Sequence, residues 1–137
     1  MPQYFKELSF NTSDKSIINI TEDIERVINE FSVINGLINL SILHTSCSLM
    51  VQENADPLVQ QDILNFLEEI APEKKYFHSS EGPDDMPAHL KSLITQTHLS
   101  LSIKNKKLIL GIWQGIFIIE HRISNNLRNV LIHIMEV

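Results

Sequence analysis

The sequence predicts an α+β domain with mainly antiparallel sheets. Strand-like segments stand near both ends of the chain, and segments with helical spacing lie between them. The 137 residues suffice for one domain with a single hydrophobic core, so we treat residues 1–137 as one unit. A hydrophobic content of 43% and a charged content of 20% are ordinary for a globular protein.

The first part of the chain alternates between strands and a helix. Residues Gln3–Phe10 and Ser16–Ile20 are predicted as two short strands joined by a turn. Thr21 is the expected cap of a helix whose apolar residues repeat at helical spacing, and Gly36 lies just past its end. Leu37–Leu43 returns to a period of two, which indicates a half-buried strand.

Two further helices are expected in the middle of the chain. After the extended residues Ser48–Gln52, Asp56 is the expected cap of a helix and Pro57 its first residue. A shorter helix is predicted near Pro87–Thr95, where apolar residues again follow helical spacing.

The last part of the chain has the pattern of strands. Leu99–Ile103 alternates between apolar and polar residues, and an Asn-Lys turn follows. Lys107–Ile119 is almost wholly apolar and is predicted as one long extended segment, with a bulge near its two glycines. Val130–Met135 alternates again and is the expected final strand.

Charge and composition narrow the class of protein. A net charge of -6 and a pI near 5.4 argue against a nucleic-acid partner, which would require a basic surface. The longest apolar stretch, Leu108–Ile119, is too short for a spanning helix, so no membrane partner is expected. The start of the chain does not resemble a signal peptide, and Cys47 is the only cysteine. A cytoplasmic location is therefore expected.

The stretch His78–His89 is the strongest candidate for a functional site. It combines two histidines with the carboxylates of Glu81, Asp84 and Asp85, and a glycine and two prolines stiffen it as a loop. Grouped carboxylates are unfavourable unless they are solvated, share protons or face a cation. Since imidazole and carboxylate groups are metal ligands, we expect a divalent ion here, either zinc, magnesium or manganese.

Capping is the alternative explanation of this stretch. Asp84 or Asp85 can cap a helix that starts near Met86–Pro87, because Asp at the cap and Pro in the first turn is a common combination. That explanation accounts for one carboxylate and leaves the two histidines and the other acids without a role. The sequence does not rank Asp84 against Asp85 as a metal ligand.

Other polar residues are candidates for substrate binding. Lys91 and Arg122 are either cationic clamps for an anionic substrate or solvated surface charges. Trp113 and Gln114 can stack on and hydrogen-bond to a planar heterocycle, although an aromatic residue in an apolar strand is as often part of the core.

The remaining histidines and the cysteine are unequal candidates for a functional site. His44 follows a strand and precedes two hydroxyl residues, a usual position for a site residue on a rigid scaffold. His98 and His133 lie beside or within regular strands and are expected to be surface or core residues. Cys47 as a nucleophile would require an orienting partner, which the sequence does not identify.

Several segments together resemble the secondary thiamine-phosphate synthase family, also called the YjbQ family. They occur in the family's order and span most of the chain: His44-Thr45-Ser46, Gln52 to Pro57, Tyr76 with His78, Glu81 to Lys91, Leu110 to Ile116, and Glu120-His121-Arg122. One departure is Ile112, because the family's pattern usually has threonine before Trp-Gln. A substrate contact through that hydroxyl would be missing in this chain.

The resemblance implies a sandwich-like fold with two packed antiparallel sheets and two to three helices. It also implies a homotrimer with pockets near the subunit boundaries. The matching positions His44, His78, Asp85 and His89, with Glu120 as a further candidate, would line a polar, metal-capable site. Among them His44, Asp85, His89 and Glu120 are the expected catalytic residues, and His78, Asp85 and His89 are the expected metal ligands.

Two hypotheses for the function follow from the resemblance. The first is a metal-assisted transferase that joins hydroxymethylpyrimidine diphosphate to thiazole phosphate and releases diphosphate, or that acts on another small phosphorylated substrate. The second is a non-catalytic trimeric module that binds a phosphorylated metabolite in the same pocket. A third, weaker hypothesis treats the stretch His78–His89, called the acidic loop from here on, as a contact between subunits.

Overall fold

The computed structural model describes residues 1–137 as eight strands and three helices in two antiparallel sheets. The predicted α+β fold with two antiparallel sheets and helices is confirmed. The elements are β1 (Gln3–Ser13), β2 (Ser16–Asn19), α1 (Thr21–Glu30), β3 (Gly36–Ile42), β4 (Cys47–Glu53), α2 (Pro57–Ile70), α3 (Asp85–Ile94), β5 (His98–Lys104), β6 (Lys107–Leu108), β7 (Gln114–Glu120) and β8 (Asn125–Glu136).

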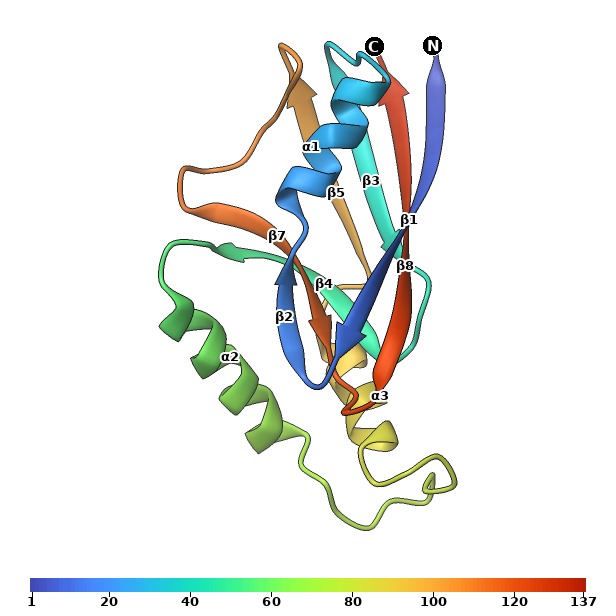
Figure 1. Cartoon of the computed structure of the whole chain (residues 1–137), viewed down its shortest axis with the longest axis vertical. Helices are drawn as coiled ribbons and strands as arrows, with labels where there is room; N and C mark the ends of the chain where they lie inside the picture. The colour runs from blue at the N-terminus through green and yellow to red at the C-terminus, as the bar shows by residue number, and fades with distance from the viewer.

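One sheet has five strands in the order β1-β8-β3-β5-β6, and the other has three in the order β2-β7-β4. Strand β8 is an inner strand, because it pairs with β1 along the whole length of β1 and with β3 on its other side. Figure 1 shows α1 against the sheets at one end of the molecule, and α3 with the preceding loop at the other end. Both chain termini lie at the end near α1 (Figure 1).

A single hydrophobic core of 16 buried residues fills the space between the sheets and α1. The period of two in β8 points Val130, Ile132 and Ile134 inward, as the sequence predicts. Helix α1 contributes Ile24 and Ile28 at helical spacing. Each fully buried aliphatic side chain of this kind stabilises the fold by about 1.5–3 kcal/mol.

The predicted long strand Lys107–Ile119 is wrong. The structure has β6 and β7 there, separated by a turn in which the Gly111 N–H donates to Gln114 Oε1 at 2.6 Å and the Gln114 N–H donates to Gly111 O at 3.0 Å. The chain leaves one sheet at β6 and enters the other at β7. The sequence stays apolar across this break for two different reasons. Ile112 and Trp113 are apolar residues of an exposed turn, whereas the apolar residues of β7 are buried on both faces of the strand.

The helix starts follow the sequence in part. Asp56 caps α2 through a hydrogen bond from the Leu58 N–H at 2.9 Å, with Pro57 as the first helical residue, as predicted. Thr21 does not cap α1; its hydroxyl instead accepts a hydrogen bond from the Ile116 N–H at 2.9 Å, which ties the helix to β7. None of the three helices combines the length and the apolar character that a membrane-spanning helix requires.

Helix α3 begins at Asp85, two residues earlier than predicted, and no side chain caps it. The capping alternative for the acidic stretch is therefore wrong, since the Asp84 carboxylate makes no cap hydrogen bond. Both aspartates are nevertheless buried, so their partners must be sought elsewhere in the fold.

Gly36 marks a close approach of two strands, and its replacement should be destabilising. A Cβ atom at this position would lie 2.2 Å from the backbone oxygen of Met135, so β3 and β8 would have to separate. We expect Gly36→Ala to lower the free energy of unfolding by about 1–3 kcal/mol, the usual cost of overpacking. Urea denaturation would measure the loss. Gly111→Ala is the matched control, because the three atoms nearest to its Cβ, the first at 3.1 Å, all belong to the flexible Gln114 side chain.

Candidate functional site

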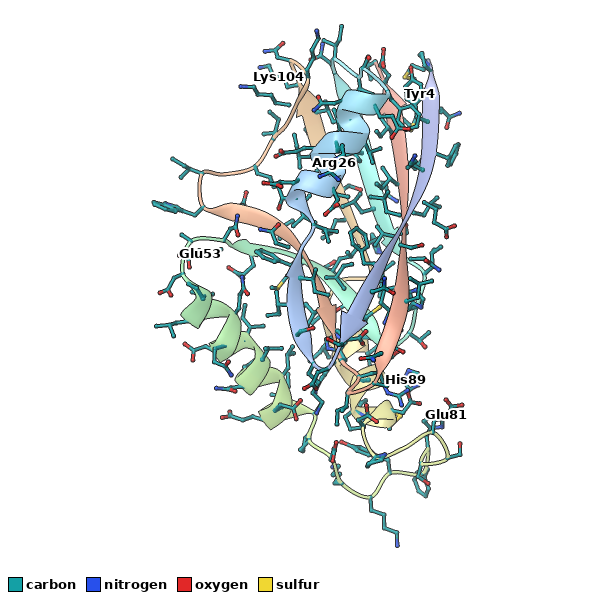
Figure 2. All side chains as sticks on the ribbon, in the orientation of Figure 1. Tyr4, Arg26, Glu53, Glu81, His89 and Lys104 are labelled. Atoms are coloured by element: carbon teal, nitrogen blue, oxygen red, sulfur yellow. The ribbon has the colours of Figure 1, made fainter.

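The acidic loop and the start of α3 bring His78, Asp85 and His89 together. Asp85 and His89 are separated by four residues on α3, so they lie on one face of the helix, and His78 reaches them from the preceding loop. Nε2 of His78 lies 2.7 Å and Nε2 of His89 lies 3.1 Å from Oδ2 of Asp85. Candidate ligand atoms of the three residues all lie within 4.8 Å of one another. Figure 2 shows His89 and Glu81 at this end of the molecule.

The orientation of His89 is fixed from outside the cluster. Its Nδ1 lies 2.9 Å from the backbone oxygen of Thr45, and a carbonyl oxygen only accepts hydrogen bonds, so Nδ1 carries the proton. In the neutral ring, Nε2 then has a lone pair that faces the Asp85 carboxylate. Two acceptors at this distance repel each other unless a proton or a cation lies between them. The arrangement is typical of a metal-binding histidine whose second nitrogen donates to a carbonyl.

Arg122 holds the acidic loop from the end of β7. Its guanidinium donates to Asp84 Oδ2 at 2.9 Å, to Asp85 Oδ1 at 2.6 Å and to the backbone oxygen of Glu81 at 3.0 Å. Asp84 Oδ2 also accepts from the Ile123 N–H at 2.9 Å. The structure therefore separates the two aspartates: Asp84 faces Arg122 and the backbone, whereas Asp85 keeps one oxygen toward the histidines.

The electrostatics of the cluster keep Asp85 ionised. Burial by itself raises the pKa of Asp85, but the hydrogen bond from His78 and the charge of Arg122 outweigh burial and hold that pKa below its usual value. The hydrogen bond to Asp84 raises the pKa of Arg122 despite its partial burial. An ionised carboxylate between two imidazoles is a suitable ligand for a divalent cation.

His44 lies next to the residue that orients His89, but it is not part of the cluster. Its Nε2 accepts a hydrogen bond from the Asn129 N–H at 2.8 Å, so this nitrogen is engaged with β8. Burial, followed by the charge of Arg128, lowers the pKa of His44, which keeps the ring neutral at pH 7. The following residue, Thr45, supplies the carbonyl that accepts from His89.

Glu120 is buried completely, contrary to the expectation that it acts on a substrate. Its two carboxylate oxygens accept from Arg128 at 2.7 and 2.6 Å, and the Thr12 hydroxyl and the Arg122 N–H at 3.1 Å donate to them as well. These hydrogen bonds outweigh the effect of burial and lower the pKa of Glu120. A side chain enclosed in this way cannot contact a substrate.

Of the four expected substrate-binding residues, the structure brings only Arg122 into contact with the cluster. Lys91 is only 2% exposed and pairs with Glu68 of α2, so it is neither a phosphate clamp nor a solvated surface charge. Trp113 is 63% exposed and is not a core residue. Gln114 pairs with Glu53, which Figure 2 labels far from His89. The donors of Arg122 are occupied by the acidic loop, so it is not a free clamp either.

Two features near the cluster were not predicted. The run Lys74–Phe77 lines a hollow of about 370 Å³ directly before His78, and the Lys74 ammonium lies 5.4 Å from the centre of the Tyr76 ring. Arg128 occupies an inward-facing position of β8. The sequence held a signal for each, since two lysines and two aromatic residues follow the end of the second helix, and an arginine shares the apolar face of a strand.

Possible nucleophiles elsewhere are enclosed. Burial raises the pKa of Cys47 to about 12, so this thiol is not reactive at neutral pH. Ser48 Oγ lies 2.9 Å from Nε2 of His121, but both side chains are buried and no substrate reaches them. His98 is exposed, and His133 contacts Gln3 at 2.8 Å and stacks on Phe5, as expected for residues outside a site.

The chain is similar in sequence to proteins of several organisms. It is 42% identical to the UPF0047 protein sll1880 of Synechocystis sp. over 134 residues, which cover 96% of this chain and 91% of that protein. It is 35% identical to the UPF0047 protein YjbQ of Escherichia coli O157:H7 over 130 residues, 93% of this chain and 94% of that protein.

Solved structures agree with this relationship. A YjbQ/UPF0047 family protein of Clostridium acetobutylicum superposes with a TM-score of 0.87 at 33% identity and covers 95% of this chain and 99% of its own. A conserved hypothetical protein of Thermus thermophilus superposes with a TM-score of 0.83 at 37% identity, covering 96% and 99%. The family model described as UPF0047 protein YjbQ-like matches residues 6–137, and the chain therefore belongs to the YjbQ/UPF0047 family.

Proposed function

We propose that this protein is a metal-dependent enzyme that acts on phosphorylated small molecules, with His78, Asp85 and His89 as the metal ligands. The observation that carries the proposal is the convergence of these side chains, with the Nε2 lone pair of His89 directed at the Asp85 carboxylate by the hydrogen bond to Thr45. Two nitrogens and one oxygen favour zinc or manganese over magnesium, which prefers oxygen ligands.

The chain's own groups suit a phosphorylated substrate. A divalent ion at this site would neutralise charge on phosphate oxygens as a leaving group departs. Arg122 keeps Asp85 in place and ionised, and Thr45 keeps His89 in the ligand tautomer. Lys74 and Lys75 line the hollow formed by the residues that precede His78 in the chain, and they are our candidates for the cationic groups that Lys91 and Arg122 cannot supply. Phe77 in the same run is fully exposed and can contact a planar ring.

The family resemblance names one reaction of this class. In thiamine phosphate formation, the carbon–oxygen bond of hydroxymethylpyrimidine diphosphate breaks and the electron pair leaves with diphosphate. The ring nitrogen of thiazole phosphate forms the new bond to the same carbon, so no oxidant or reductant is required. The difficult step is the departure of the anionic group, which is what a cationic site stabilises.

One observation favours the alternative, a non-catalytic module that binds a phosphorylated metabolite. The candidate nucleophile–base groups, Cys47 and the Ser48–His121 pair, are buried away from any ligand. A transferase of the proposed type needs no protein nucleophile, however, so turnover distinguishes the two functions.

The test combines metal content with turnover. Purified untagged protein, incubated with zinc, manganese or magnesium and dialysed, should retain close to one ion per chain in elemental analysis. With the retained metal it should release diphosphate from hydroxymethylpyrimidine diphosphate and thiazole phosphate faster than the chelated protein. Metal retention without turnover of any diphosphate substrate would favour the binding module, and no metal retention would contradict the proposed site.

We further propose a homotrimer, which the family resemblance implies. Helix α2 supports it: Leu67 is its only buried residue, while Leu58, Phe66 and Ile70 are exposed apolar side chains. Size-exclusion chromatography with light scattering should give three times the chain mass of 15.7 kDa. Phe66→Asp should shift the mass toward one chain if α2 lies in the interface, whereas Asn65→Asp, on the same helix, should leave it unchanged. A monomeric wild-type protein would contradict the trimer.

A further inference from the structure

We infer that Glu120 and Arg128 form a buried positioning pair that fixes two of the candidate metal ligands, His89 and Asp85, through two separate chains of hydrogen bonds. The inference rests on the metal site proposed above and assigns a role to groups that do not contact the metal or substrate. Arg128 and Glu120 are 5% and 0% exposed, and their guanidinium and carboxylate meet in two hydrogen bonds.

The first chain runs from Arg128 to His89. Nη2 of Arg128 donates to Ser46 Oγ at 3.0 Å and to the Ser46 backbone oxygen at 3.3 Å. Ser46 directly follows Thr45, whose carbonyl accepts from His89 Nδ1. These residues belong to the loop between β3 and β4, which has no regular backbone pairing of its own. Arg128 therefore holds the loop beside the Thr45 carbonyl, and this carbonyl selects the tautomer of His89.

The second chain runs from Glu120 to Asp85. Oε2 of Glu120 accepts the Arg122 N–H at 3.1 Å, which fixes the backbone just after β7. From that position the Arg122 guanidinium donates to Asp85 Oδ1 at 2.6 Å and leaves Oδ2 toward the histidines. The Glu120 carboxylate thus binds both Arg128 and the backbone of Arg122, the two residues that position His89 and Asp85.

The cost of burying this pair supports a positioning role. Taking two charges out of water is expensive, and apolar replacements of buried ion pairs are often as stable as the original. Arg128 lies on the inward face of β8, where Val130, Ile132 and Ile134 form part of the hydrophobic core. Its guanidinium bonds both oxygens of Glu120 and two atoms of Ser46, a set that a lysine cannot reproduce.

The test uses Arg128→Lys, which keeps the charge beside Glu120 but loses the fork geometry, and Ser46→Ala, a milder change that removes one hydrogen-bond acceptor. Glu68→Gln is the control. It weakens the ion pair with Lys91, which lies on α3 like Asp85 and His89, but it changes neither chain of hydrogen bonds. Zinc affinity is measured by competition with a chelator. The ring tautomer of His89 is measured in the metal-free full-length protein from its ¹⁵N shifts at pH 8.

Arg128→Lys should bind zinc about 10–100-fold more weakly, the range usual for groups that orient ligands, and Ser46→Ala should show a smaller loss. In Arg128→Lys, His89 should no longer be held as the Nδ1–H tautomer, whereas Glu68→Gln should match the wild type in both measurements. If Arg128→Lys folds and its zinc affinity and His89 tautomer match those of the wild type, the inference is overturned. If Arg128→Lys does not fold, the same result in Ser46→Ala overturns it. If the wild type binds no zinc, the proposed function fails and the tautomer alone decides the positioning role.

Discussion

Replacement of His89 by alanine should lower the affinity for zinc or manganese by more than about 100-fold and abolish metal-dependent turnover. Loss of an outer partner of a ligand costs about 10–100-fold, and loss of one of three ligands should exceed that. The fold should survive, because His89 is only partly buried and alanine is the most favourable helix residue. Elemental analysis after dialysis, with circular dichroism on the same samples, measures both effects.

The matched control for this experiment is His98→Ala. His98 is exposed at the start of β5 and is not among the clustered residues, so its loss should change neither metal content nor turnover. An intact His89→Ala protein that keeps its full metal content would show that the ion is held elsewhere. Loss of metal together with unfolding would instead require His89→Gln, which retains more of the side-chain volume.

The fold could be predicted largely because its sheets and helices obey simple periods. Val130, Ile132 and Ile134 alternate with more exposed residues, and the Asp56–Pro57 pair marks the start of α2. The break between β6 and β7 could not be predicted from hydrophobicity, because the run stays apolar where the chain is exposed. Ile112 and Trp113 stand in that exposed turn, and nothing in their residue type distinguishes them from the buried residues of β7.

The candidate site was predictable where it depends on local spacing. Asp85 and His89 are four residues apart, which a helix turns into a shared face, and His78 lies in the adjoining loop. The partners of the long cationic side chains were not predictable, because they come from other helices, strands and loops. Lys91 turns to Glu68 of α2, and Arg122 turns back to the acidic loop, choices that depend on tertiary packing.

Acidification should destabilise the metal-free protein already between pH 6.5 and 5, and His121 is the main reason. Burial lowers the pKa of His121 from 6.5 to about 3, so the folded protein keeps this ring neutral while the unfolded chain protonates it. The unfolded state then binds more protons, and stability falls as pH falls through this window. The charged side chains that influence the pKa of this ring come from α2, α3, β7 and β8, namely Glu68, Lys91, Glu120 and Arg128.

The loss of stability caused by His121 differs from that caused by the carboxylates in the pH range where it occurs. One proton costs about 1.4 kcal/mol per pH unit, so His121 alone removes about 2 kcal/mol between pH 6.5 and 5, and the lowered pKa of His44 acts in the same direction. Glu120 and Asp84 also have lowered pKa values, but they contribute stability that is lost only below about pH 4.5, as they begin to protonate.

Urea denaturation of chelator-treated protein at pH 7.5, 6.5 and 5 tests the role of His121. In His121→Gln the fall in unfolding free energy between pH 6.5 and 5 should shrink to what His44 contributes, although the variant starts less stable because its contact with Ser48 changes. His133→Gln, on the partly exposed face of β8, should keep the wild-type slope. An equal slope in His121→Gln and the wild type would mean that the ring is protonated as readily in the folded protein as in the unfolded chain. Ser48 would then have to accept its hydrogen bond.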